Sequence, residues 1–558
     1  MGPRGRSFLT GAAILGAASL ISKLLGAVYR IPYQNIVGDL GLAAYNKIYP
    51  LYSIILIIAT AGFPLAISKI VAEQLITGDK AGARRVLNIS IYVLSITGIL
   101  SFALLFFGAD FIAKLMGNSE LSIVIKSVSF ALLIVPLMAA IRGYYQGHQY
   151  MVPTASSQVV EQIVRVITIL FLAYFFMEYG YGVYYAAAGA TFGALTGGIF
   201  AFLVLLLYWK KTNRITDEIV LESGEKRIYQ RESTFTVINK ILYFSIPIAL
   251  GSIFLPLLGL VDSFSVSNTL KLVLLKSEYL FGIYIKGQSL TDYTEYWFGI
   301  YSRGQALVQF GAFFAAALSI ALVPSISEAN IRNNSRLVIK RSDLALRLTL
   351  MISLPATVGL AILAEPINIL LYKDSVGSMT IAIYSIVIVF STLYVTSAAI
   401  LQGLGRVMVP AKNLLIGIII KIILNIVLVY YFSINGAVMA TIGAYSVAST
   451  LNLLAIKRSI KIEYKLLDFF VKPVMATFIM GVVVYISKVL LIIFFNHYIV
   501  SERLLMLAVT LLTISLGVIV YSIGLLITGT LTKQDLEYIP RYGSKVIKIA
   551  EKINIFKS

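Results

Sequence analysis

Long apolar segments recur from one end of the chain to the other and leave it few folds to adopt. The hydrocarbon core of a bilayer is ~30 Å thick, and a helix needs about 20 apolar residues to cross it. Fourteen segments reach that length, near residues 8–30, 43–68, 87–108, 121–141, 154–176, 183–208, 237–261, 295–325, 343–364, 378–402, 412–431, 434–456, 469–493 and 502–528. Because a membrane offers no water to exposed backbone groups, we predict an all-α polytopic membrane protein with about 14 transmembrane helices.

The composition agrees with this fold class and excludes several functions. Of the 558 residues, 59% are hydrophobic and 13% are charged, whereas soluble domains are roughly 45–50% apolar and ~25% charged. The absence of cysteine excludes disulfides, Cys-ligated zinc, iron–sulfur clusters and thiol catalysis. The two histidines, His148 and His497, lie far apart, so we expect neither a metal site nor a cofactor. No GxxxxGK(S/T), GxSxG or HExxH motif occurs, and we therefore expect a transporter rather than an enzyme or an ATP-hydrolysing pump.

The positive charge of the chain is unevenly placed. Its net charge is +20, and 30 of the 46 lysines and arginines follow even-numbered apolar segments or lie in the two tails, against six on the opposite side. By the positive-inside rule, both termini lie in the cytoplasm and the number of spans is even. This charge therefore reports topology, and we expect no nucleic-acid partner. In the C-terminal tail, residues 545–556 carry apolar side chains on one helical face and lysines on the other, which predicts a helix lying flat on the cytoplasmic leaflet.

The two halves of the chain share short motifs in the same order. QGHQYMVP at 146–153 matches QGLGRVMVP at 402–410, and ATFGA at 190–194 matches ATIGA at 440–444. Both halves enter the membrane from the inside, so they predict two six-helix lobes around a central cavity, as in many alternating-access carriers. A duplicated scaffold that transports nothing is the alternative. The predicted domains are an N-terminal lobe with a cytoplasmic linker (1–236), a C-terminal lobe (237–460), and two accessory helices with an amphipathic tail (461–558).

Ionisable side chains inside the expected spans carry an excess of positive charge. Such groups are costly in a membrane and usually face a cavity or a partner. The cations are Lys23, Arg30, Arg165, Arg303 and Lys421, and the carboxylates expected at comparable depth are Glu161 and Asp262. This imbalance predicts a water-filled cationic cavity for a phosphate-bearing substrate, because guanidinium groups pair with phosphate in a bidentate manner. Two alternatives stay open for individual residues: Arg30 snorkels from a helix end, and Arg165 pairs with Glu161 one turn away.

Four motifs resemble one group of bacterial membrane proteins. They are ISKLLGAVYRIPYQNIVGD (21–39), YPLY (49–52), AGFPLAISKIVAE (61–73) and GIYSRGQALVQ (299–309). Together they resemble the multidrug/oligosaccharidyl-lipid/polysaccharide (MOP) exporter superfamily, in the branch that contains the lipid II flippase of peptidoglycan synthesis and the stage V sporulation protein B of Gram-positive bacteria. The resemblance covers nearly the whole chain. It implies two six-helix lobes around a cationic cavity and two extra helices that form a groove for a polyprenyl tail.

The resemblance also implies substrate-binding positions. Lys23 and Arg30 match a first-helix pattern of cations, Arg303 corresponds to an eighth-helix arginine, and Lys47 lies close to a position that is acidic in relatives. An arginine pair in the second helix of the Gram-negative flippases has no counterpart in 51–63. We therefore expect the substrate to be bound by a cationic set of Lys23, Arg30, Arg303, Lys47, Arg165 and Lys421.

An ion that drives transport is a separate expectation. A sodium site of some relatives maps to Asp262, Asn425 and Thr441, and Glu161 is the other expected carboxylate at that depth. Lys421 lies one turn from Asn425, so its ammonium is an alternative to a bound ion. We expect Na⁺, H⁺ or the membrane potential as the driving force, since a potential supplies ~2.3 kcal/mol per elementary charge per 100 mV.

These observations predict a multi-pass flippase of a bacterial cytoplasmic membrane that translocates an undecaprenyl-pyrophosphate-linked saccharide by alternating access. Lipid II is the leading substrate, in growth or in sporulation, with cell-wall synthesis proteins as expected partners. Another lipid-linked unit of a wall polysaccharide comes next. A cation-coupled drug exporter needs more carboxylates in its pocket than this chain offers. A non-transporting scaffold for wall synthesis would tolerate neutralising Lys23, Arg30 and Arg303 together.

Overall fold

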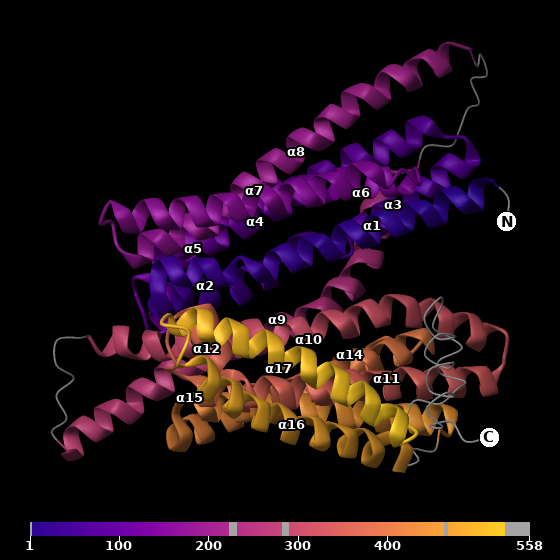
Figure 1. The fold of residues 1–558 in the computed structure, drawn as a ribbon. Coiled ribbons are helices and arrows are strands. Elements are labelled where there is room, and N and C mark those ends of the chain that lie inside the picture. Colours follow the sequence, from indigo (N-terminus) through magenta and orange to yellow (C-terminus); the bar gives the residue numbers. More distant parts are fainter. Residues whose placement is uncertain (1–2, 223–231, 282–288, 463–466, 531–558) are drawn as a thin grey trace. The chain divides into compact units, whose positions relative to one another are not determined.

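The computed structural model describes residues 3–222, 232–281, 289–462 and 467–530 (Figure 1). Within these ranges the chain forms seventeen α-helices and one π-helical segment and contains no strand, which confirms the predicted fold class. Packing divides the chain into two compact units, Met1–Gly299 and Ile300–Ser558, and helix α10 contributes to both.

The helices are named in chain order in Figure 1. The first unit holds α1 (Pro3–Val28), α2 (Arg30–Thr60), α3 (Phe63–Thr77), α4 (Lys80–Leu115), α5 (Leu121–Ser129), α6 (Ala131–Gly147), α7 (Val152–Glu178), α8 (Val183–Glu222), α9 (Thr234–Phe281) and the start of α10 (Leu290–Ile331). The second unit holds the rest of α10 and α11 (Ser335–Ile362), α12 (Ala364–Tyr372), α13 (Ser378–Tyr384), α14 (Ile386–Gly403), α15 (Met408–Ile460), the π-helical turn (Leu467–Val471), α16 (Lys472–Phe495) and α17 (Glu502–Ile527).

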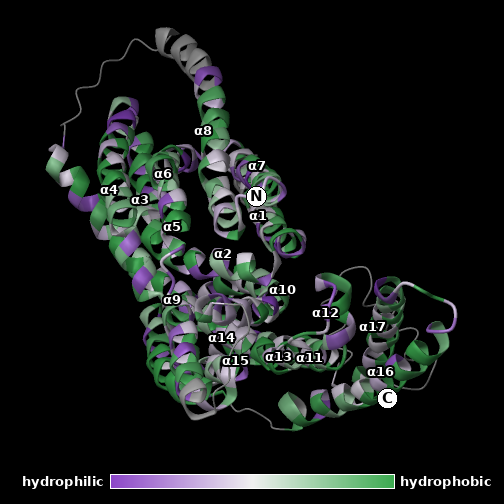
Figure 2. Cartoon of the chain, turned by 90° about the vertical axis from the view of Figure 1, so that its left-hand side faces the viewer, coloured by the Kyte–Doolittle hydropathy of each residue, from purple (hydrophilic) through white to green (hydrophobic). Residues whose placement is uncertain are grey.

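Twelve stretches of the described chain are long and apolar enough to cross a membrane. Two of them, Ile14–Thr77 and Met408–Ile460, have 64 and 53 residues, enough for two crossings each. Each is interrupted by a residue with a left-handed backbone, Gly38 (φ 69°) and Ser433 (φ 54°). Divided there, the stretches give the fourteen spans predicted from the sequence. Figure 2 shows hydrophobic residues along most of the length of the helices in both units.

A row of glycines on α8 brings this helix against α7 in the first unit. Gly189, Gly193 and Gly197 repeat every four residues and therefore lie on one face. A Cβ atom at Gly197 would lie 2.6 Å from the carbonyl oxygen of Glu161, and one at Gly193 would lie 3.0 Å from that of Arg165. Small residues at this spacing let two membrane helices approach closely. The contact fixes the turn of α7 that carries both charged side chains.

The second unit is organised around α11. This helix packs against α14 on one side and α16 on another, and α16 and α17 form an antiparallel pair. The Tyr521 hydroxyl of α17 donates to the Met351 carbonyl of α11 at 2.7 Å, which ties the C-terminal helices to the core of this unit.

The predicted lobe boundaries and the predicted tail helix both stay predictions. The boundaries at 236 and 460 come from a repeat in the sequence. The division into two units comes from how densely the helices pack, and it does not test a sequence repeat. The predicted tail helix at 545–556 lies outside the described residues.

Candidate functional site

A glutamate on α7 is shared by two arginines in the first unit. Glu161 Oε1 accepts a hydrogen bond from Arg165 Nη2 at 2.7 Å, and its Oε2 accepts one from Arg142 Nη2 at 2.9 Å. Arg142 also donates from Nε to the Ser157 hydroxyl at 3.0 Å. All three charged side chains are at most 15% exposed. Two guanidinium groups thus face one carboxylate, and this arginine cluster (Arg142, Glu161, Arg165) keeps one excess positive charge.

Tyrosines from α2 line the region beside the arginine cluster. Tyr45, Tyr49 and Tyr52 follow one face of the helix, and neighbouring ring centroids are 5.9 and 6.4 Å apart. The hydroxyl of Tyr29 donates to that of Tyr45 at 2.7 Å, and the Tyr33 ring lies 5.4 Å from the Tyr45 ring. Rings in such offset and tilted arrangements form a rigid surface with both apolar faces and polar hydroxyl groups.

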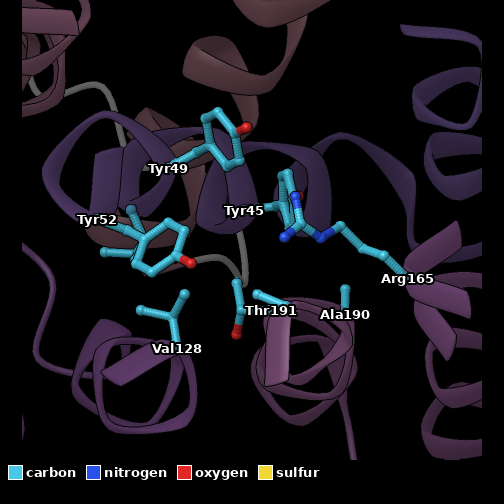
Figure 3. A pocket seen from close by; sticks show the side chains of 9 residues that line it. Tyr45, Tyr49, Tyr52, Val128, Arg165, Ala190 and Thr191 are labelled. Atoms are coloured by element: carbon cyan, nitrogen blue, oxygen red, sulfur yellow. The ribbon is translucent and has the colours of Figure 1, made fainter. Parts of the chain in front are cut away.

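A small cavity lies between these tyrosines and Arg165. Figure 3 shows the Arg165 side chain extending from α7 to the Tyr45 ring, with Tyr49 and Tyr52 following along α2. The cavity has a volume of about 10 Å³ open to water, room for about one molecule, and is lined by Tyr45, Ile48, Tyr49, Tyr52, Val128, Arg165, Ala190, Thr191 and Ala194. Nε of Arg165 and the hydroxyl of Tyr52 are buried without a hydrogen-bond partner among the described residues. Buried polar atoms are rarely left unpaired in a protein, so both atoms are available to a ligand or a water.

The two predicted cations of the N-terminal region, Lys23 in α1 and Arg30 at the start of α2, differ in burial. Arg30 is 9% exposed and Lys23 is exposed. They are seven residues apart, which is about 10 Å along a helix and nearly two turns. The Tyr29 side chain lies close to Arg30, whereas Nε of Arg30 has no hydrogen bond in the described part of the chain. Arg30 is therefore buried among tyrosines beside the cavity, which argues against snorkelling.

Lys47 is held by an ion pair inside the first unit. Its ammonium lies 2.5 Å from Glu295 Oε1, and the two side chains are 0% and 1% exposed. Nζ also donates to the Met116 carbonyl at 3.4 Å and lies 5.2 Å from the centre of the Phe298 ring. The expectation that Glu161 and Asp262 are the only deep carboxylates is therefore wrong. Glu295 was missed because it is the first residue of its predicted span.

Arg303 is bonded on all sides within the second unit. Its Nη1 and Nη2 donate to Asp374 Oδ1 and Oδ2 at 2.7 and 2.9 Å, a bidentate pair. Nη1 also lies 3.2 Å from Asn368 Oδ1, and the guanidinium lies 5.1 Å from the centre of the Tyr372 ring. The side chain of Arg303 is 1% exposed, while that of Asp374 is 41% exposed. In this conformation the pair fixes the connection between α12 and α13, and a substrate-binding role of Arg303 stays a prediction.

The residues predicted for ion coupling are divided between the two units. Asp262 is buried in α9 of the first unit, and Asn425 and Thr441 are buried in α15 of the second. Lys421 is buried in α15 one turn before Asn425. The Thr441 hydroxyl donates to the Ala437 carbonyl at 2.9 Å. The coupling site stays a prediction.

An apolar groove lies between α11 and α16 in the second unit. Its volume is about 440 Å³, and its lining residues are Leu354, Val358, Ile362, Val474, Thr477, Phe478, Gly481, Val482 and Tyr485. A Cβ at Gly481 would lie 2.9 Å from Val358 Cγ1, so glycine at this position allows the two helices to approach. The family resemblance implies a groove formed by the last two helices, and that groove stays a prediction.

The first unit thus brings together part of the predicted set. Arg30 and Arg165 lie beside one tyrosine-lined cavity, and Glu161 holds Arg165 in place. Sequence reasoning missed the tyrosines, although Tyr45, Tyr49 and Tyr52 have the spacing of a helix face. It also placed Arg142 with the loop charges, because this residue lies at the end of an apolar run and nothing in the sequence shows its contact with Glu161.

Comparison with known proteins places the chain in a family. Residues 8–329, more than half of the chain, match the family described as "Polysaccharide biosynthesis protein", and residues 298–510 match the family "Lipid II flippase MurJ". In Bacillus subtilis (strain 168), the chain is 34% identical to "Uncharacterized membrane protein YabM" over 80% of each chain. It is 30% identical to "Lipid II flippase MurJ" of the same organism over 82% of this chain and 84% of the relative.

A solved structure supports the same fold. The structure "Lipid II flippase MurJ, inward closed conformation" superposes with a TM-score of 0.62 at 16% identity, over 92% of this chain and 98% of that one. The match covers both units of this chain. The protein is a multi-pass membrane protein that belongs to the polysaccharide biosynthesis protein family, in the branch of the MOP exporter superfamily that contains the lipid II flippases.

Proposed function

We propose that this protein is a flippase for an undecaprenyl-pyrophosphate-linked saccharide, with lipid II as the leading substrate. The observation that carries the proposal is the excess positive charge at a cavity with unpaired buried donors. Arg165 Nε and the Tyr52 hydroxyl point to a missing anionic or polar group, and the arginine cluster leaves one positive charge uncompensated. A pyrophosphate supplies acceptor oxygens for both.

The size of the cavity limits what it binds. Ligand pockets usually enclose about 300–1,000 Å³, whereas this cavity has room for about one water. A pyrophosphate therefore enters only in a conformation in which the tyrosines and Arg165 lie further apart. Arg165 and Arg30 would hold the pyrophosphate, because guanidinium groups are well matched to phosphate oxygens. The sugars would then lie along the exposed edge of Tyr49 and towards Lys23. Tyr49 is 36% exposed and presents part of its ring.

The lipid tail needs a separate apolar path. The groove between α11 and α16 offers one, since an extended isoprenoid chain buries apolar surface and makes no hydrogen bonds. Placing the tail outside the polar cavity keeps the charged head and the apolar chain in environments that suit each of them.

The cycle we propose is alternating access between two six-helix lobes, with both termini in the cytoplasm. Loading occurs from the cytoplasmic side, where the positive-inside rule places most basic loops. The membrane potential, Na⁺ or H⁺ drives the cycle, and proteins of cell-wall synthesis are the expected partners. A lipid-linked unit of another wall polysaccharide is the second candidate substrate, favoured by the family description matched by residues 8–329.

Complementation tests the function. A bacterium depleted of its own lipid II flippase should regain growth and surface-exposed lipid II when it expresses this chain. Arg165→Gln should restore much less growth and surface-exposed lipid II at matched membrane levels, whereas Arg332→Gln, which removes an exposed arginine paired with Glu328, should restore both fully. Failure of the unmodified, well-expressed chain would exclude lipid II as substrate. Full rescue by Arg165→Gln would overturn the proposed site.

A further inference from the structure

A second groove in the first unit combines a basic end with apolar walls. It lies between α4, α6 and α8, has a volume of about 330 Å³, and is lined at one end by Arg84, Asn88 and Trp209. The remaining lining is aliphatic or aromatic and includes Ile91 and Leu137. This groove shares no lining residue with the cavity at Arg165.

The guanidinium of Arg84 is available to a ligand. Its described contact is with the Trp209 ring, whose centre lies 6.0 Å from Cζ, and within the described ranges it forms no ion pair or hydrogen bond. The neighbouring Arg85 is different, because it donates to the Glu232 carbonyl at 2.6 Å and to the Thr234 hydroxyl at 3.0 Å. Of these two adjacent arginines, Arg85 is already hydrogen-bonded within the protein and Arg84 is not.

The groove is basic at one end and apolar along the rest, which matches a lipid with a charged head group and an apolar chain. Arg84 begins a stripe on α4 that continues to Ile91, seven residues or about 10 Å further along the helix. Trp209 is of a type that is enriched where a membrane meets water. Basic pockets between transmembrane helices on the cytoplasmic side favour anionic lipid head groups. Bulky walls with a gap between them suit an acyl chain better than a docked helix, which prefers small residues.

We propose that the groove between α4, α6 and α8 binds one anionic phospholipid, with its phosphate at Arg84 and an acyl chain along Ile91 and Leu137. Asn88, one turn after Arg84, is placed to donate to the glycerol or ester oxygens. The indole of Trp209 packs at the level of the head group. A zwitterionic lipid carries the same phosphodiester, but it also brings a quaternary ammonium beside the Arg84 guanidinium, and the repulsion between these two cations selects an anionic lipid.

Lipid binding to the purified full-length protein tests the proposal. Native mass spectrometry in detergent would compare phosphatidylglycerol with phosphatidylcholine of the same acyl chains. We expect phosphatidylglycerol to bind more tightly, and Arg84→Gln to weaken it about tenfold, the usual effect of losing a charge-assisted hydrogen bond. Arg85→Gln is the matched control and should change binding by less than about twofold, because its guanidinium is already occupied.

A second variant separates the head group from the chain. Leu137→Trp fills the apolar part of the groove and leaves Arg84 in place, so it should weaken both phospholipids. Equal binding of the two lipids, an unchanged affinity in Arg84→Gln, or displacement of phosphatidylglycerol by an equal concentration of undecaprenyl phosphate would overturn the proposal. The assay contains no saccharide substrate, so its failure and that of the proposed flippase function are distinguishable.

Discussion

Two buried arginines, Arg165 in the first unit and Arg303 in the second, look equivalent in the sequence but have different surroundings. Arg303 faces Asp374 one to one and bidentately. Arg165 shares Glu161 with Arg142, so positive charge is left over, and its Nε is unpaired among the described residues beside a cavity. Depth in the membrane therefore does not identify a binding arginine. The uncompensated charge beside the tyrosine-lined cavity is the reason we propose Arg165 rather than Arg303 as the substrate-binding arginine.

The largest effect expected from this comparison is on stability at Arg303. Asp374→Ala leaves a fully buried guanidinium without its carboxylate and should lower the free energy of unfolding by about 3 kcal/mol. Arg303→Met keeps the side-chain volume, and the remaining carboxylate is 41% exposed and can be hydrated, so the loss should be smaller. Chemical unfolding in detergent would measure both. Equal losses of stability in Asp374→Ala and Arg303→Met would contradict the interpretation that Asp374 mainly neutralises the buried Arg303.

The close contact between α7 and α8, which supports the turn that carries Arg165, provides the second test. Gly197→Ala places a Cβ against the backbone of α7 at Glu161, and overpacking of this kind costs about 2 kcal/mol. Gly198→Ala is the matched control, because its nearest neighbour would be 3.6 Å from the new atom. We expect a lower melting temperature and weaker transport for the first variant alone. A normal melting temperature in Gly197→Ala would show that α7 and α8 do not need this close contact.

These contacts also mark what the sequence is able to predict. The spans follow from hydropathy, because each needs only a long apolar run, and the breaks at Gly38 and Ser433 separate runs already visible in the sequence. The pairing of Arg165 with Glu161 follows from their spacing on one helix. Local rules of this kind act within a single element.

Contacts between distant segments are beyond such rules. Asp374 is 71 residues from Arg303, and Glu295 is 248 residues from Lys47. Each carboxylate looks like a loop or helix-end charge in the sequence. The count of buried cations was therefore nearly right, whereas the count of uncompensated ones required the tertiary structure.

The third prediction separates binding from positioning within the arginine cluster. Arg165→Gln removes a donor at the cavity and should reduce transport about tenfold at equal expression, as expected for a lost charge-assisted hydrogen bond. Arg142→Gln acts through Glu161 and should reduce transport less. Its remaining effect should appear as a lower melting temperature, because it also loses the bond to Ser157. A larger transport defect in Arg142→Gln than in Arg165→Gln would reverse the two roles.

The smallest expected effect concerns the tyrosines that surround Arg30 and Arg165 in the first unit. Tyr45→Phe keeps the ring but breaks the hydroxyl contact with Tyr29, whose side chain lies close to Arg30. A neutral hydrogen bond contributes about 1 kcal/mol, so transport should fall about fivefold. Tyr92→Phe is the control, since this exposed tyrosine of α4 lines neither the cavity nor the grooves and its hydroxyl has no hydrogen bond to the described residues. Transport assayed in vesicles at matched protein levels would measure both variants. An equal fall in the two would show that the hydrogen bond between Tyr29 and Tyr45 has no special role in transport.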